Sequence, residues 1–180
     1  MEQLNMKAFH FLNVQNFTIF MLSRLFRKFK RYIYAYRLKL ICAPANKKMR
    51  GVARGIRNHN PLNIEYNRRN QWEGQVGHDG RFVIFVSPVY GFRAGARVLR
   101  SYQRRNINTV HRIVHTFAPS HENNSDHYAK MVSQWSGFGL HQPLDVSRDD
   151  TTTRIIQAMA RMEVGHQYPL KEVMKGVQLA

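Results

Sequence analysis

The sequence predicts a mainly helical α+β domain, with one small β-hairpin followed by about four helices and preceded by a basic amphipathic helix. Three observations lead to this class. The dipeptide Asp79-Gly80, which favours a tight turn, separates two short runs with strand character. Four later segments repeat apolar residues at helical spacing, with capping or helix-stopping residues at their ends. Residues 21–40 combine apolar residues at helical spacing with basic residues between them.

Charge divides the 180-residue chain into two parts. Lys and Arg total 28 against 11 acidic residues, which gives a net charge of +17. Residues 1–50 hold eleven of these basic residues and one acid, Glu2. We therefore predict an N-terminal segment and linker at residues 1–48 and a compact domain at residues 49–180. The surplus charge predicts a polyanionic partner: nucleic acid, anionic lipid or an anionic cell envelope.

The N-terminal segment has the pattern of a helix that lies on a membrane surface. The apolar run before Met21 is shorter than the roughly 20 residues of a membrane span. Its basic residues follow the apolar run, whereas those of a signal peptide precede it. We expect residues 20–40 to bind an anionic membrane peripherally. A helix packed on its own domain, or an extension of the reading frame ahead of Met49, is the alternative.

Four helices are predicted after the hairpin. They begin near Ser87, Thr109, Asn124 and Asp149, and the fourth ends at Gly165. Their predicted inward residues are Phe92, Ala96, Leu99, Tyr102, Val110, Ile113, Val114, Phe117, Tyr128, Met131, Val132, Trp135, Ile155, Ile156, Met159 and Met162.

Before the hairpin, the run RGIRNHNPLNIEYN at residues 54–67 is rich in asparagine. Asparagine side chains bond to nearby backbone and tolerate left-handed conformations, so they favour turns and caps. This run is therefore expected to be a structured loop or a site.

One acidic residue interrupts the apolar face of the fourth helix. Glu163 is four residues after Met159 and seven after Ile156, just before Gly165. Partial burial raises the pKa of a carboxyl group, which suits it to give a proton to a leaving group near neutral pH. A frayed last turn, with Glu163 in solvent, is the alternative.

Several ordered motifs resemble those of phage and prophage proteins of the lysozyme-like, lytic-transglycosylase-related type. They are RGIRNHNPLNI, WEGQ, DGRFVIF, SPVYGFRAGARVL, SYQRR, NTVHRIV, FAPSHEN and MEVG, within residues 51–169. Members of this family are often described only as virion structural proteins. The resemblance implies a lysozyme-like fold and cleavage of the glycan strand of peptidoglycan.

In related enzymes, a helix that ends in the catalytic glutamate precedes an Asn-containing segment. Here no such helix precedes the similar segment Asn60–Ile64, whereas the helix containing Glu163 comes later. The resemblance therefore implies a circularly permuted arrangement, in which the final helix packs beside Asn58–Ile64 and brings Glu163 to the mouth of a cleft. Leu62 replaces a usual glycine and Val164 a frequent asparagine, so an altered or inactive site is the alternative.

The chemistry of glycan cleavage suggests roles for particular residues. Glu163 is the candidate catalytic acid. Glu65 and Glu73 are candidates for a second carboxylate, and a surface charge on the hairpin is the alternative, which is favoured for Glu73. Most glycosidases use two carboxylates, but the acetamido group of the substrate can replace one of them. The candidate substrate-binding residues are Asn60, Asn63, Tyr66, Trp72, Gln75 and Tyr128. The two asparagines would bond N-acetyl groups or fix the loop, and aromatic rings would stack on sugars or close a small core.

We therefore expect a phage-type, virion-associated protein that degrades peptidoglycan as a lytic transglycosylase, muramidase or glucosaminidase. Its expected location is the virion or the host cell envelope, and other virion proteins are further expected partners. A non-catalytic virion protein that binds the cell wall is the main alternative. Nucleic-acid binding is another, through a row of basic residues on one helix: Arg93, Arg97, Arg100, Arg104 and Arg105.

His111 and His115 have the four-residue spacing of a metal-binding pair. The glutamate of an HExxH motif is absent between them, and the single Cys42 excludes a multi-cysteine zinc site. The sequence therefore predicts no metal and no cofactor, and it favours a solvated helix face for the two histidines.

Overall fold

The computed structural model describes residues 51–119 and 124–180, which belong to one compact unit, Met49–Ala180. The basic helix predicted within residues 20–40 and the linker before Met49 lie outside the described residues.

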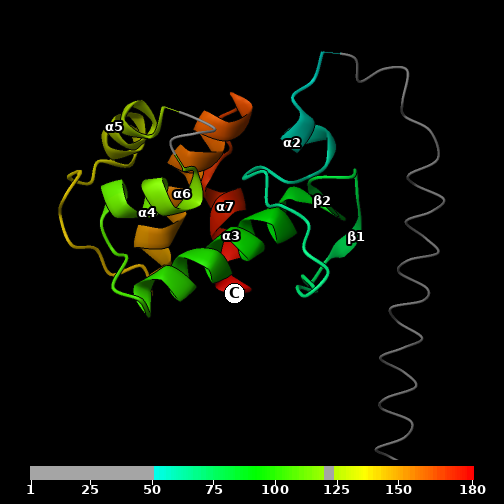
Figure 1. The fold of residues 1–180 in the computed structure, drawn as a ribbon, viewed down its shortest axis with the longest axis horizontal. Helices are drawn as coiled ribbons and strands as arrows, with labels where there is room; N and C mark the ends of the chain where they lie inside the picture. Colours follow the sequence, from blue (N-terminus) through cyan, green and yellow to red (C-terminus); the bar gives the residue numbers. More distant parts are fainter. Residues whose placement is uncertain (1–50, 120–123) are drawn as a thin grey trace, which may run out of the picture. The chain divides into compact units, whose positions relative to one another are not determined.

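The described chain is mainly helical with one small antiparallel sheet, which confirms the predicted α+β class. The elements in order are α2 (Arg54–Arg57), β1 (Gln75–His78), β2 (Val83–Phe85), α3 (Pro88–Gln103), α4 (Val110–Phe117), α5 (Ser125–Ser136), α6 (Asp149–Val164) and α7 (Leu170–Gln178) (Figure 1). Helices α2 and α7 were not predicted. Four residues are too few to show a helical period in α2, whereas Val173 and Val177 did carry a weak signal for α7.

The expected capping chemistry is found at some helix ends, whereas Ser87, the predicted cap of α3, makes no side-chain capping hydrogen bond. Thr109 and Asn124 each accept a hydrogen bond from a backbone N–H in the first turn of α4 and α5. Gly137 and Gly165 end α5 and α6 in the left-handed region, with φ of 73° and 66°. Helix α6 is therefore regular to its last turn, so the alternative of a frayed end at Glu163 is wrong.

The core surrounds α6, which packs against α2, α3, α5 and α7. Eleven predicted inward residues are buried: Phe92, Ala96, Leu99, Val110, Ile113, Val114, Tyr128, Val132, Ile155, Ile156 and Met159. Five others, Tyr102, Phe117, Met131, Trp135 and Met162, are only partly buried. Tyr102, Phe117 and Met162 stay partly open because they line a cavity.

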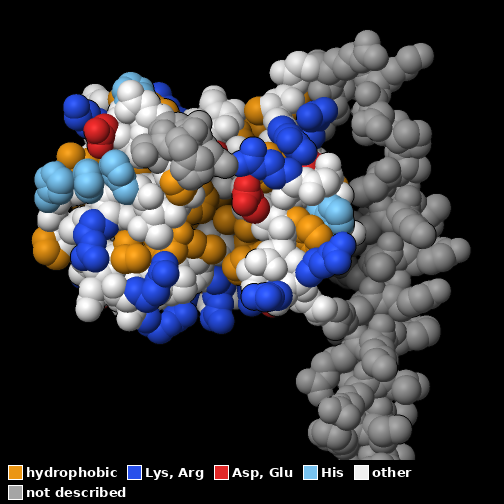
Figure 2. Space-filling view, viewed as in Figure 1, with side chains coloured by type: hydrophobic (Ala, Val, Ile, Leu, Met, Phe, Trp, Pro, Cys, Tyr) orange, Lys and Arg blue, Asp and Glu red, His pale blue; other side chains and the backbone are white. Residues whose placement is uncertain are grey.

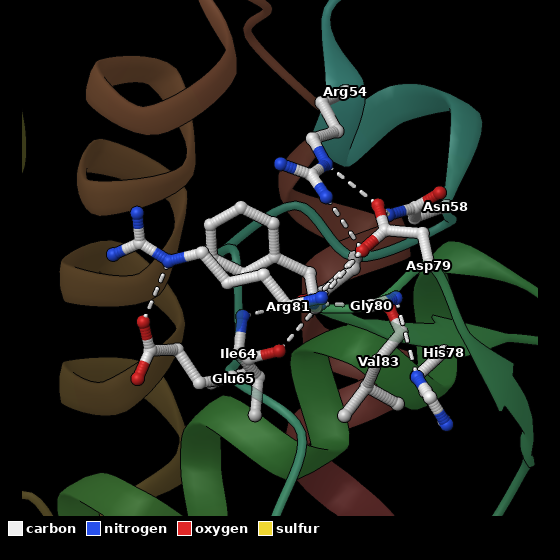
Figure 3. Close-up of polar contacts among 11 residues, drawn as sticks. Arg54, Asn58, Ile64, Glu65, His78, Asp79, Gly80, Arg81 and Val83 are labelled. Atoms are coloured by element: carbon white, nitrogen blue, oxygen red, sulfur yellow. Dashed lines mark hydrogen bonds and ion pairs between the residues drawn. The ribbon is translucent and has the colours of Figure 1, made fainter.

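The hairpin turn is tied to α2 through Asp79. Arg54 donates to its carboxylate from Nε at 2.6 Å and Nη2 at 2.8 Å, and Asn58 Nδ2 donates at 2.6 Å (Figure 3). The backbone N–H groups of Arg81 and Phe82 also donate to it. These bonds, above all those from Arg54, hold the pKa of Asp79 far below its usual value, although partial burial opposes them. Asp79 thus joins the turn and α2 into one unit.

The basic row on α3 is used partly within the protein. Arg93 and Arg97 donate hydrogen bonds to the carbonyl oxygens of the last two residues of the chain. Arg100 pairs with Asp149 at the start of α6, at 2.7 Å. Three members of the row considered for phosphate binding therefore hold α6 and the C-terminus against α3.

Candidate functional site

An open cleft lies between the asparagine-rich loop and the helical part of the domain. It encloses about 1040 Å³ and is lined by residues 62–67, the hairpin, residues 116–119, the start of α5 and the last turn of α6. Hydrophobic side chains occupy a hollow in the middle of the face drawn in Figure 2, with Lys and Arg side chains to its right and below it. The lining of the cleft thus combines apolar side chains with the charged side chains of Arg81, Glu65 and Glu163.

Glu163 lies in the wall of this cleft and is held from two sides. The Nδ2 atom of Asn63 donates to its Oε2 at 2.9 Å, and the hydroxyl of Tyr128 donates to its Oε1 at 2.9 Å. The three side chains come from the loop, α5 and α6, and all three line the cavity. The predicted packing of the helix that carries Glu163 against the asparagine-rich loop is therefore confirmed. The prediction that it is the final helix is wrong, because α7 follows it.

Tyr128 is the buried member of this group, with 2% of its surface exposed. Burial raises the pKa of its hydroxyl well above the usual value, and the charge of Glu163 and their hydrogen bond raise it further. Tyr128 therefore keeps its proton at neutral pH and donates a hydrogen bond to the carboxylate of Glu163.

Asn60 and Asn63 of the loop have different roles, one in the loop itself and one in the cleft. Asn60 is 0% exposed, and its amide bonds to the backbone of Ile64 and Val83. Asn63 adopts a left-handed conformation, with φ of 47°, and reaches Glu163. Asn60 therefore fixes the loop, while Asn63 lines the cleft.

Glycines allow this loop to sit close to its neighbours. A Cβ atom on Gly55 would lie 2.5 Å from Val164 Cγ1 and 2.6 Å from the backbone oxygen of Asn60. On α3, a Cβ atom on Gly95 would lie 2.1 Å from Leu62 Cδ1. Leu62 and Val164, the two positions at which the sequence departs from the motifs that it resembles, thus both fill space left by a glycine. Their buried side chains hold the loop against α3 and α6.

The other candidate residues fall into two groups. Glu65, Tyr66 and Trp72 line the cleft together with Glu163. Glu65 is 62% exposed at its side chain and pairs with Arg81 at 2.9 Å. Gln75 and Glu73 lie outside the described lining of the cavity: Gln75 accepts a hydrogen bond from the backbone of Trp72, and Glu73 pairs with Arg93 at 2.8 Å.

The aromatic candidates already have contacts of their own. Tyr66 stacks on His78, with ring centroids 4.0 Å apart and an interplanar angle of 10°. The Nε1 atom of Trp72 is buried without a hydrogen-bond partner. Tyr66 is thus oriented by its neighbour, and Trp72 packs partly into the core.

Several cleft residues were missed by the sequence analysis. Arg81 and Phe82 come from the hairpin, and residues 116–119 and His127 come from the end of α4 and the start of α5. No local pattern marks these positions, because only the packing of α4 and α5 against the loop brings them to one cavity.

Fold and site together define a class: a mainly helical α+β domain with a hydrogen-bonded carboxylate in an open cleft. No family profile matches the chain. Protein P5 of Pseudoalteromonas phage PM2 is 38% identical over 133 residues, which cover 71% of this chain and 81% of that protein. The chain therefore belongs to the family of this bacteriophage protein.

Among the residues that the structure describes, the helices are too short or too polar to cross a membrane.

Proposed function

We propose that this protein is a phage-type, virion-associated enzyme that cleaves the glycan strand of peptidoglycan. In this proposal the domain is lysozyme-like and circularly permuted, and Glu163 is the catalytic acid. The observation that carries the proposal is the carboxylate of Glu163 in the wall of an open cleft, hydrogen-bonded to Asn63 and Tyr128. Membership of a bacteriophage protein family supports the phage context.

The contacts of Glu163 constrain where its proton is held. Cleavage of a glycosidic bond requires a proton on the leaving oxygen and support for an oxocarbenium-like centre. The amide nitrogen of Asn63 only donates, so a proton on the facing oxygen of Glu163 would weaken that contact, because a carboxyl O–H oxygen is a poorer acceptor than a carboxylate oxygen. The hydroxyl of Tyr128 donates or accepts, so it keeps its contact in both protonation states of Glu163. Tyr128 is therefore a positioning residue for the acid.

Support for the positive centre comes from one of two sources. Glu65 lines the same cavity as Glu163 and is the protein's own second carboxylate, held by Arg81. The acetamido group of the substrate is the other source, and it requires only Glu163. If Glu65 supplies this support, Glu65→Gln should abolish cleavage. If the acetamido group supplies it, Glu65→Gln should still cleave the glycan.

The size and lining of the cleft suit a carbohydrate polymer. Its volume of about 1040 Å³ lies at the upper end of the roughly 300–1,000 Å³ of small-ligand sites. Tyr66 and Trp72 offer aromatic surface for sugar rings, and exposed loop amides offer hydrogen bonds. The basic residues 20–40 would hold the protein at an anionic membrane surface of the envelope.

A second candidate is a virion protein that binds the cell wall without cutting it. This wall-binding candidate is favoured because each carboxylate oxygen of Glu163 already accepts a hydrogen bond from within the protein.

The test incubates the purified full chain with peptidoglycan sacculi and analyses soluble products by mass spectrometry. The Glu163→Gln variant removes the acid, and Glu73→Gln makes the same change of charge outside the described lining of the cavity. We expect muropeptides from the wild type and Glu73→Gln but none from Glu163→Gln, and anhydro ends would identify a transglycosylase. If no form releases products while all sediment with the sacculi, the enzyme proposal fails and the wall-binding one replaces it.

A further inference from the structure

A second group of polar side chains joins α4 to the start of α5, outside the described lining of the cleft. His111 and His115 stack on α4, with ring centroids 4.1 Å apart. Asp126, in the first turn of α5, places Oδ1 2.9 Å from His115 Nε2 and 3.9 Å from His111 Nε2. The ring centroid of His141, in the loop after α5, lies 5.0 Å from that of His111. Histidine side chains gather over α4 on the face shown in Figure 2.

We propose that His111, His115 and Asp126 form a binding site for a transition-metal ion, with Zn²⁺ as the best match. One ligand atom from each residue lies within 4.8 Å of the other two. Two ligands at about 2.0–2.1 Å from a tetrahedral ion lie about 3.3–3.4 Å apart. The two measured separations from Asp126, 2.9 Å and 3.9 Å, bracket this value. Small side-chain movements therefore suffice to form the site.

The types of donor also match the ion. Two imidazoles and one carboxylate are the ligands that zinc prefers when cysteine is absent, and two histidines four apart on a helix present their rings on one face. The fourth position is open to water or to His141. The side chains are reachable from solvent, because His111 is 35% exposed and Asp126 71% exposed. An ion therefore has an entry path.

A simple surface ion pair is the competing explanation. It accounts for the contact between His115 and Asp126, but it does not need His111. The metal site needs all three residues, so the two explanations differ in what the loss of His111 does.

The position of the site suggests its consequence for the molecule. A bound ion would connect α4 to the first turn of α5, two residues before Tyr128, which contacts Glu163 in the cleft. Metal binding is thus expected to stiffen one wall of the cleft, and it does not depend on the proposed catalytic role of that cleft.

The test measures binding of Zn²⁺ alone to the metal-free full chain, by competition with a chromophoric chelator at neutral pH. Binding of Co²⁺ is followed by the visible absorption that a tetrahedral site produces. The variants are His111→Gln, His115→Gln and Asp126→Asn. The matched control is His166→Gln, at an exposed histidine between α6 and α7. Far-UV circular dichroism verifies that each variant is folded.

We expect one Zn²⁺ per chain, an intense Co²⁺ spectrum and a higher melting temperature with Zn²⁺. Each ligand variant should lose at least the roughly 10- to 100-fold in affinity that loss of an outer-shell partner costs, and His166→Gln should keep the wild-type affinity. The proposal is overturned if the wild type does not bind Zn²⁺, or if folded His111→Gln and Asp126→Asn bind it as well as the wild type. Equal binding by these variants would place the metal on other residues of the chain.

Discussion

Replacement of Asn60 should reveal how much one buried amide contributes to the loop beside Glu163. Its Nδ2 atom donates to the carbonyl oxygens of Ile64 and Val83, each at 2.9 Å, and its Oδ1 accepts from the N–H of Ile64 at 2.8 Å. The residue is 0% exposed, so solvent does not replace these bonds easily. Asn60→Ala removes all three bonds and takes this partner from the N–H of Ile64 and the carbonyl oxygen of Val83, whereas the carbonyl oxygen of Ile64 still accepts from the N–H of Val83 at 3.0 Å.

The magnitude follows from the number of groups affected. A buried polar group that loses its partner costs about 1–3 kcal/mol. Two groups are affected, and water entering the space of the missing side chain recovers part of their cost, so we expect Asn60→Ala to lower the free energy of unfolding by about 2–4 kcal/mol. This is a large share of the roughly 5–15 kcal/mol that stabilises a typical domain.

Asn60→Asp keeps the shape and separates hydrogen bonding from packing. Its second carboxylate oxygen faces the carbonyl oxygens of Ile64 and Val83, so the folded protein disfavours the charged form. The pKa of the introduced carboxyl is therefore higher in the folded than in the unfolded chain. Since the unfolded value is about 3.9, the loss of stability grows as the pH rises above about 4. Asn60→Asp should be less stable than Asn60→Ala at pH 7, and the difference between their free energies of unfolding should become smaller near pH 4.

Urea unfolding followed by circular dichroism at both pH values measures these differences. The controls are Asn70→Ala and Asn70→Asp, at an exposed asparagine between the same loop and the hairpin. Both should change stability by no more than about 0.5 kcal/mol. A loss below about 1 kcal/mol for Asn60→Ala, or an Asn60→Asp variant as stable as wild type at pH 7, would refute the assigned role of Asn60.

Three further predictions concern other parts of the site. Asp79→Asn should lower the free energy of unfolding by about 1–2 kcal/mol at pH 7. This figure is discounted for screening by solvent, because the side chain of Arg54 is 43% exposed. The pKa of Asp79 is lowered by folding, so this contribution is present above the unfolded pKa and is lost as the pH falls below about 4. Urea titrations of wild type and variant should converge there, and a gap that stays constant with pH contradicts the assignment. Gly55→Ala should lower the free energy of unfolding by about 1–3 kcal/mol in the same assay, because the added methyl group would meet the backbone oxygen of Asn60. An unchanged urea midpoint would exclude that close contact. Tyr128→Phe removes a hydrogen bond that orients Glu163. It should therefore slow muropeptide release by about 10-fold or more, while the affinity for sacculi stays the same. An unchanged rate of release would exclude a positioning role for Tyr128.

Much of the architecture could be predicted because it is encoded locally. The turn at Asp79-Gly80, the caps at Thr109 and Asn124, and the glycine stop at Gly165 act over a few residues each. Apolar spacing likewise indicated the buried faces of α3 to α6. It also marked Glu163 as a carboxyl on an otherwise apolar face. Helix α2 escaped prediction because one turn is too short for any periodicity.

The tertiary structure decided which of these residues meet. Asn60 and Asn63 have the same side chain three positions apart, yet one is sealed in the loop and the other faces Glu163, 100 residues away in sequence. The difference depends on how closely the loop approaches α3 and α6, which Gly95 on α3 and Gly55 on α2 permit. Asp126 was similarly invisible as a partner for His111 and His115, because it lies on another helix. Sequence alone indicated the hairpin turn and helices α3 to α6. Contacts between distant segments, which no local pattern encodes, determined the cleft and the histidine cluster.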